Sequence, residues 1–378
     1  MKCAAKHLAA FAISLALFLS VSGCIFASDI QKKEFDTAAR AADAVGKFYD
    51  ELPDSARDYI NSNGDMTQLR PFEGLKAIVT DIAGEIDEYI AQPFKIIGVS
   101  VAILVLCALA NAVCDSSAAA MAVRICGSAA VAVAVTGTVL ALAQEAAGTI
   151  VRARTFSAAF VPVFAGLLVS SGHIGTGAFY GSAVLAAQSA FAGALTSYLE
   201  PLTGVILGLS VVSGIKDNGL DAIVGGIKRL TLWVLTGATT IFCGIVKLQT
   251  TVTASADSLA LRASRFVIGG AVPVIGRTVS EALATVGGGL SVIRGSVGTA
   301  GILAIAAIFL PAILKCILCS WALSLTAVAA ETLDMKDSAR SIRGIKAGVD
   351  ILAAIVTFNV LCFVIATAVM INIGVGTL

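Results

Sequence analysis

The sequence is poor in charged residues and almost devoid of histidine. Only 13% of its 378 residues are charged, whereas soluble domains average about 25%, so a soluble globular protein is excluded. The net charge of +1 leaves no basic surface of the kind that nucleic acids require, and we expect no nucleic-acid partner. The chain has two histidines, His7 and His173, and no nucleophile–base pair stands out. We therefore expect no metal, no cofactor and no enzymatic activity.

Hydrophobic residues take the place of the missing charges. They make up 57% of the chain, 36 glycines accompany them, and the mean hydropathy is +0.92. Glycine-rich apolar sequences suit closely packed membrane helices. The composition predicts an all-α, polytopic helical membrane protein with about six to eight spans, some of them short or re-entrant.

The first 27 residues have the features of an export signal. Lys2 and Lys6 precede an apolar run at 8–21, and small residues follow, which is the order of a secretory signal. Cleavage after Ala27 is the simplest interpretation. The sequence VSGC at 21–24 also resembles a bacterial lipobox, in which Cys24 carries a lipid. Both interpretations place the segment that follows outside the cytoplasm.

Residues 28–93 form an acidic exported domain. Between Ser28 and Lys95 the chain carries 8 Lys/Arg and 14 Asp/Glu, a net charge of −6. Apolar stripes at helical spacing predict three short helices in this domain. The membrane domain, residues 94–378, then begins with an apolar run.

Eight apolar segments follow, and two clusters of basic residues orient them. Counting inward from the exported domain places Lys228–Arg229 and the segment Lys336–Lys346 in the cytoplasm, as the positive-inside rule requires. Arg152 and Arg154 then lie outside, so either the short segments 158–171 and 202–215 do not both cross or 247–297 lies at the interface. The segments are 94–113, 125–143, 158–171, 176–197, 202–215, 230–246, 299–330 and 348–375.

The stretch from Ala271 to Gly301 is too apolar for a loop and too rich in glycine and charge for a plain span. Arg277 and Glu281 lie off its apolar stripe, and Gly287, Gly288 and Gly289 interrupt it. Such a helix suits a membrane interface or a re-entrant position. We expect 277–293 to lie at the outer leaflet as a packing or conduit-lining surface, and 247–265 to be amphipathic. The apolar stripe is Val279, Leu283, Val286, Leu290 and Ile293.

An earlier segment echoes this stretch. Val-Pro-Val occurs at 161–163 and again at 272–274, each followed by a glycine. Broken apolar segments in two halves of a membrane protein mark functional cores, although a chance recurrence in a valine-rich chain explains the match equally well. Lys315 stands alone in an apolar run, where snorkelling or a pair with Glu281 or Glu200 would stabilise it. Cys316 and Cys319 have metal-site spacing without a second pair, so we interpret them as core residues.

The order of these features resembles the stage III sporulation protein AE family of endospore-forming Firmicutes. The resemblance rests on VPVFAGLLVSSG from 161, on PVIGRTVSEALATVGGGLSVIRGSVGTAG from 273, on Pro311 in the following span, and on the basic segment before the last span. The candidate functional or structural residues are Pro162, Gly166, Gly172, Pro273, Gly276, Arg277, Glu281, Gly287, Gly288, Gly289, Arg294, Gly298, Gly301 and Lys315.

The resemblance implies a membrane platform or conduit subunit of a secretion-like channel complex between mother cell and forespore. It also implies as partners membrane lipid and the other subunits of that complex: an ATPase, ring-forming proteins and small membrane subunits. The implied location is the cell membrane, multi-pass, with the N-terminal domain outside the cytoplasm. The alternative is a self-sufficient secondary transporter with broken helices at 158–177 and 270–301.

Overall fold

The computed structural model describes residues 76, 80, 86–113, 116–214, 219–271 and 276–372. Six long helices make up nearly all of this part, which confirms the all-α expectation. The signal segment and most of the acidic domain lie outside the described residues. The helices are α5 (Ile86–Val113), α6 (Ser117–Ser170), α7 (Ile174–Ser213), α8 (Leu220–Ala271), α9 (Gly276–Thr332) and α10 (Lys336–Ile371).

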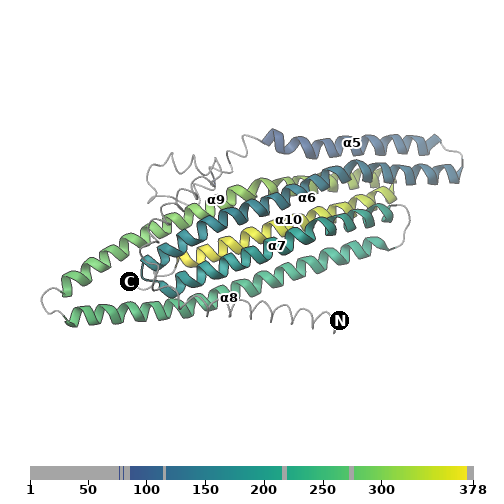
Figure 1. Cartoon of the computed structure of the whole chain (residues 1–378). Helices are drawn as coiled ribbons and strands as arrows, with labels where there is room; N and C mark the ends of the chain where they lie inside the picture. Colours follow the sequence, from purple (N-terminus) through teal and green to yellow (C-terminus); the bar gives the residue numbers. More distant parts are fainter. Residues whose placement is uncertain are drawn as a thin grey trace, which may run out of the picture.

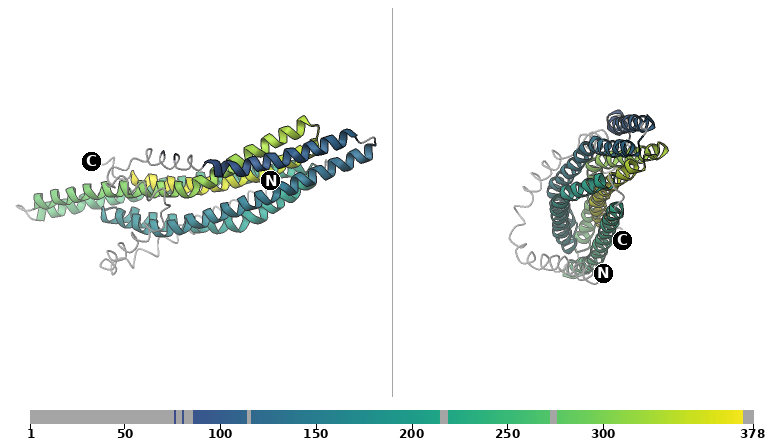
Figure 2. Two further views of the ribbon diagram at one scale, coloured as in Figure 1. Left: turned by 90° about the horizontal axis from the view of Figure 1, so that it is seen from above. Right: turned by 90° about the vertical axis from the view of Figure 1, so that its right-hand side faces the viewer.

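The helices run up and down in one elongated bundle (Figure 1). α10 is central and packs against α6, α7, α8 and α9, while α5 packs against α6 and α9 at one edge. α8 lies at the other edge (Figures 1 and 2). We call the end where α8 and α10 begin the basic end, and the end where α7 and α9 begin the hairpin end.

Two pairs of predicted segments are single helices. α6 contains the segments 125–143 and 158–171 with Pro162 inside it, and α7 continues through Pro201, which lies between the expected segments 176–197 and 202–215. Proline removes one backbone donor, but in an apolar setting the remaining amides still need partners, so the helix continues. Neither 158–171 nor 202–215 is therefore a separate crossing.

Five of these helices are long and apolar enough to cross a membrane, and α7 adds two shorter apolar stretches, Ile174–Ala187 and Pro201–Ser213. The protein is therefore a multi-pass membrane protein. α6 has 54 residues and α9 has 57, or about 81 and 86 Å at 1.5 Å per residue. Hydrocarbon is only about 30 Å thick, so the bundle extends well beyond it.

The expected glycine break in α9 is absent. Residues 276–332 form one helix, and Gly287, Gly288 and Gly289 all have helical backbone. Each glycine lowers helix propensity by about 1 kcal/mol relative to alanine, which three residues in a helix of this length tolerate. Of the two candidate broken segments, 158–177 consists of the end of α6, a short turn and the start of α7, and 276–301 is continuous helix.

A row of aromatic rings forms the centre of the bundle on α6. Phe156, Phe160 and Phe164 stack at centroid distances of 5.7 and 5.5 Å. Phe164 meets Tyr180 of α7 at 5.1 Å, and Phe160 meets Phe363 of α10 at 5.7 Å. All five side chains are fully buried, so this row holds α6, α7 and α10 together.

Glycines on α9 let that helix approach the aromatic row. A Cβ on Gly301 would overlap the ring of Phe160, and one on Gly298 would overlap Ile371 and reach the ring of Phe164. Both glycines were candidates from the sequence. The structure assigns them a packing role at the crossing of α6, α9 and α10.

Candidate functional site

The hairpin formed by α8 and α9 projects beyond the rest of the bundle at the hairpin end (Figure 1). Asp257 of α8 contacts the first turn of α7, and Arg294 of α9 contacts Ile371 at the end of α10. Leu261 of α8 also reaches the turn before α7, so the tip continues past its neighbours for about 15 Å on α8 and about 27 Å on α9, at 1.5 Å per residue. We call residues 258–293 the projecting hairpin.

The two segments expected to be amphipathic belong to long helices. The segment 247–265 is part of α8, and 277–293 is part of α9. Their position relative to the outer leaflet stays a prediction. Arg277 and Glu281 belong to the projecting hairpin, but their side chains lie outside the described part, as does Pro273.

Asp257 ties the base of the hairpin to α7. Its carboxylate, only 7% exposed, accepts hydrogen bonds from the backbone N–H of Gly175 at 2.9 Å and of Thr176 at 3.0 Å. The Thr176 hydroxyl donates a third at 2.8 Å. The first N–H groups of a helix lack partners within it and carry partial positive charge. The buried carboxylate of Asp257 supplies both the missing hydrogen-bond acceptor and the negative charge.

The turn between α6 and α7 packs against the same region. Gly172 has φ +89°, and a Cβ there would lie 2.8 Å from a methyl group of Leu261. Burial lowers the pKa of the His173 imidazole, the nearby Arg294 guanidinium lowers it further, and Asp257 acts in the opposite direction. The imidazole is thus kept neutral beside two charged groups.

Arg294, one of the candidate residues, is buried. Its side chain is 1% exposed, and Nη2 lies 3.5 Å from the carbonyl oxygen of Ile371. Carbonyl groups in the last turn of a helix lack intrahelical partners and favour cations. Arg294 therefore closes α10 at the hairpin end.

A second polar centre joins three helices near the basic end. Asp350 of α10 accepts hydrogen bonds from Lys228 of α8, from Lys346 at 3.0 Å and from Ser320 of α9 at 2.6 Å. The two predicted basic clusters thus lie together at one end, and one carboxylate bridges them.

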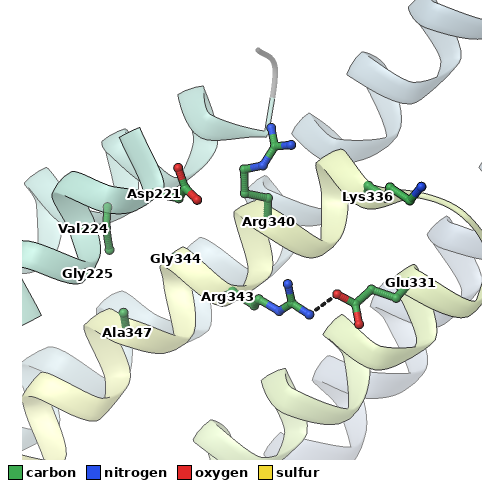
Figure 3. A pocket seen from close by; sticks show the side chains of 9 residues that line it. All are labelled: Asp221, Val224, Gly225, Glu331, Lys336, Arg340, Arg343, Gly344 and Ala347. Atoms are coloured by element: carbon green, nitrogen blue, oxygen red, sulfur yellow. Dashed lines mark hydrogen bonds and ion pairs between the residues drawn. The ribbon is translucent and has the colours of Figure 1, made fainter. Parts of the chain in front are cut away.

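Next to it a polar cavity of ≈ 560 Å³ opens between α8, α9 and α10 (Figure 3). Arg343 pairs with Glu331 across it, and Arg340 donates to the Ser213 carbonyl oxygen at 3.3 Å. Arg340 also lies 3.7 Å from Asp337. Both arginines in the cavity therefore have partners within the protein: Glu331 for Arg343, and Asp337 with the Ser213 carbonyl for Arg340.

Lys315 has a partner that differs from both expected ones. Its Nζ lies 2.6 Å from Oε1 of Glu145 on α6. Ionisable groups among apolar spans are costly unless paired and often mark functional positions. This pair links α6 and α9 through the apolar part of the bundle.

The other candidates have plain structural positions. Pro162 and Gly166 lie on the exposed side of α6, Gly276 begins α9, and Gly289 is exposed with nothing near an added Cβ. Cys316 and Cys319 are buried core residues, as predicted, and within the described residues no group of three or more potential metal ligands occurs.

Sequence reasoning missed Glu145, Asp257 and Asp350. Glu145 and Asp350 each lie in an otherwise apolar part of a helix, and an isolated acid in such a run was the available signal. Asp257 gave no such signal, because its segment is rich in threonine and serine. Its contact with residue 176 spans 81 positions and exists only in the folded bundle.

Comparison with known proteins identifies the family of the chain. The family model for stage III sporulation protein AE matches residues 55–374. A relative from Bacillus subtilis (strain 168), the stage III sporulation protein AE, is 24% identical over 289 residues, which cover 72% of this chain and 70% of the relative. No solved structure matches the chain. The matched region includes every described helix, and the chain belongs to the stage III sporulation protein AE family.

Proposed function

We propose that this protein is a membrane platform or conduit subunit of a secretion-like channel complex linking mother cell and forespore during endospore formation. Membership of a sporulation family supports a role in that process. The projecting hairpin carries the finer proposal. A protein that served only its own membrane domain would have no use for two helices reaching about 15 and 27 Å past their neighbours, whereas a platform needs a surface outside the bilayer.

Two further features fit a platform better than the alternative of a secondary transporter. The transporter hypothesis requires broken helices, which in known transporters form midplane sites. In this protein α6 and α9 are continuous. The acids within the apolar bundle, Glu145 and Asp350, are each engaged by lysine, as structural pairs are. We assign no enzymatic activity to the chain.

The partners follow from the proposed complex: an ATPase, ring-forming proteins, small membrane subunits and membrane lipid. In this arrangement the basic end faces the cytoplasm, where positive charge is favoured. The projecting hairpin and the acidic N-terminal domain face the opposite side, toward the forespore.

Shortening the hairpin tests this proposal. Removing residues 265–271 and 276–282 deletes about two turns from each helix and spares Asp257, Leu261 and Arg294, which contact the bundle. We expect the shortened protein to insert and to keep its thermal stability but to lose the formation of heat-resistant spores. Normal spore counts from the shortened protein would refute the platform role. If the deletion variant does not insert into the membrane, the substitution Glu281→Gln, which leaves the length of the hairpin unchanged, is tested in the same spore assay.

A further inference from the structure

α8 exposes a straight row of large apolar side chains along its outer face. Their exposed fractions range from 40% to 71%. Residues in the row recur 18 positions apart, as Leu230 and Leu248 do, and at 3.6 residues per turn this separation is five full turns. The row is therefore one narrow face of the helix. Its members are Ile223, Leu230, Val234, Ile241, Leu248, Val252 and Leu259.

The row is longer than a membrane is thick. From Ile223 to Leu259 it covers about 54 Å at 1.5 Å per residue, against about 30 Å of hydrocarbon. The uncharged part of α8, Leu230–Val246, is long enough for the membrane, and Lys247 follows it. Leu248, Val252 and Leu259 therefore continue the row past the uncharged part.

Beyond Lys247 the composition changes but the row does not. Thr251, Ser255 and Arg262 are exposed beside it, so the apolar face is narrow and has polar flanks. A narrow apolar seam of this kind is typical of helices that pair with another helix. Because α8 is one helix from Leu220 to Ala271, this part does not lie flat on the bilayer. Counted from Leu230, about 30 Å of hydrocarbon reaches about as far as Leu248, so lipid tails do not cover Leu259.

Within the described residues nothing covers the row, and a second copy of this chain fits it best. Two copies in one membrane share an orientation, so their rows run side by side at matching heights. The opposite edge, α5, has 28 residues, about 42 Å, and is too short to cover the row. Gly237 and Gly244 adjoin the row, and a Cβ on either would meet nothing within 4 Å, which permits close approach of another helix.

We propose that the outer face of α8 is a self-association surface, along which two copies of this chain pair through parallel α8 helices from the membrane into the base of the projecting hairpin. The pairing joins two copies at the base of their hairpins, so that the hairpins project together. The proposal stands on α8 alone and holds whether or not the chain belongs to a channel complex.

Cysteine cross-linking of the full chain in membranes tests this surface. In a background with the native cysteines replaced by alanine and spore formation retained, we compare Leu248→Cys with Lys247→Cys, and Leu259→Cys with Ala260→Cys. All four positions are exposed, and each pair differs by one residue, about 100° around the helix. A short thiol-reactive cross-linker should give a dimer from positions 248 and 259, with loss of that product at 247 and 260. Tagged and untagged copies expressed together identify a dimer of this chain.

Several results would overturn the proposal: equal cross-linking at all four positions, an adduct with a different protein, a link to residues 1–75 of the same chain, or no adduct at all. Light scattering of the purified protein gives an independent reading of oligomeric state. Val252→Lys places a charge on the row and should shift the protein from dimer to monomer. A monomer for the unchanged protein in both detergent and lipid nanodiscs would also contradict the proposal.

Discussion

At the scale of single residues, small and charged side chains determine how closely the helices approach. Gly301 lies where a side chain would overlap the ring of Phe160, and Phe160 is held between two other phenylalanines of α6. Interiors packed to this density respond to one added methyl group. Among the candidate glycines, Gly298 and Gly301 lie at the crossing of α6, α9 and α10, whereas an added Cβ on Gly289 would meet nothing within 4 Å.

The first prediction contrasts two glycines of one helix. Gly301→Ala should lower the free energy of unfolding by about 1–3 kcal/mol, because the buried ring has little room to move. Gly295→Ala should be neutral or raise stability by up to about 1 kcal/mol, since an added Cβ meets nothing within 4 Å there. Thermal unfolding of the purified proteins measures both. Equal stability of the two variants would show that α6 and α9 are not packed as described.

The second prediction concerns the carboxylate that caps α7. Asp257→Asn removes the charge of a group that accepts three hydrogen bonds. A hydrogen bond to a charged group contributes about 1.5–3 kcal/mol to stability. Hydrogen exchange at residues 172–176 should quicken and the turn at 171–173 should become open to proteolysis. Asp221→Asn, an exposed acid on the same helix, serves as control. Unchanged protection in the Asp257 variant would mean that the cap contributes nothing.

At the scale of elements, the sequence predicts helices well and their lengths poorly. Hydrophobic composition predicted an all-helical membrane protein, and the breaks expected at Pro201 and at Gly287–Gly289 are absent. Local breakers are weak where no water competes for the backbone, because an unpaired amide in lipid costs more than a strained turn. Partners of charged side chains were harder to predict than helix lengths. Lys315 and Glu145 are 170 positions apart, and only the packing of α6 on α9 brings them together.

The merged helices also resolve a conflict in topology. Eight predicted segments become six helices, since α6 and α7 each contain two of them. Two helices, α8 and α9, separate the start of α8 from the start of α10. The two basic clusters therefore lie at the same end of the bundle, and Arg152 and Arg154 belong to the interior of α6 instead of a loop.

The third prediction tests this topology. Reporter fusions after Asp65 and after Ser338 should report opposite sides of the membrane, because five helices, α5 to α9, separate them. An extracytoplasmic signal at Asp65 and a cytoplasmic one at Ser338 follow from the positive-inside rule. Both reporters on one side would contradict the up-and-down arrangement of the six helices.

At the scale of the whole molecule, the protein is a bundle longer than the membrane, with distinct ends. The basic end gathers Lys228, Lys346 and Asp350 in one cluster, and the other end continues into the projecting hairpin. A subunit of this shape is suited to joining machinery in the cytoplasm to structures on the far side of the membrane.

Purification of the tagged chain from sporulating membranes in mild detergent tests the platform role most directly. The account predicts a defined complex in which this chain co-purifies with an ATPase, ring-forming proteins and small membrane subunits, and in which shortening the hairpin removes partners from the extracytoplasmic side only. A chain that purifies alone from such membranes and moves a solute across liposomes unaided would contradict the platform role and favour a self-sufficient transporter.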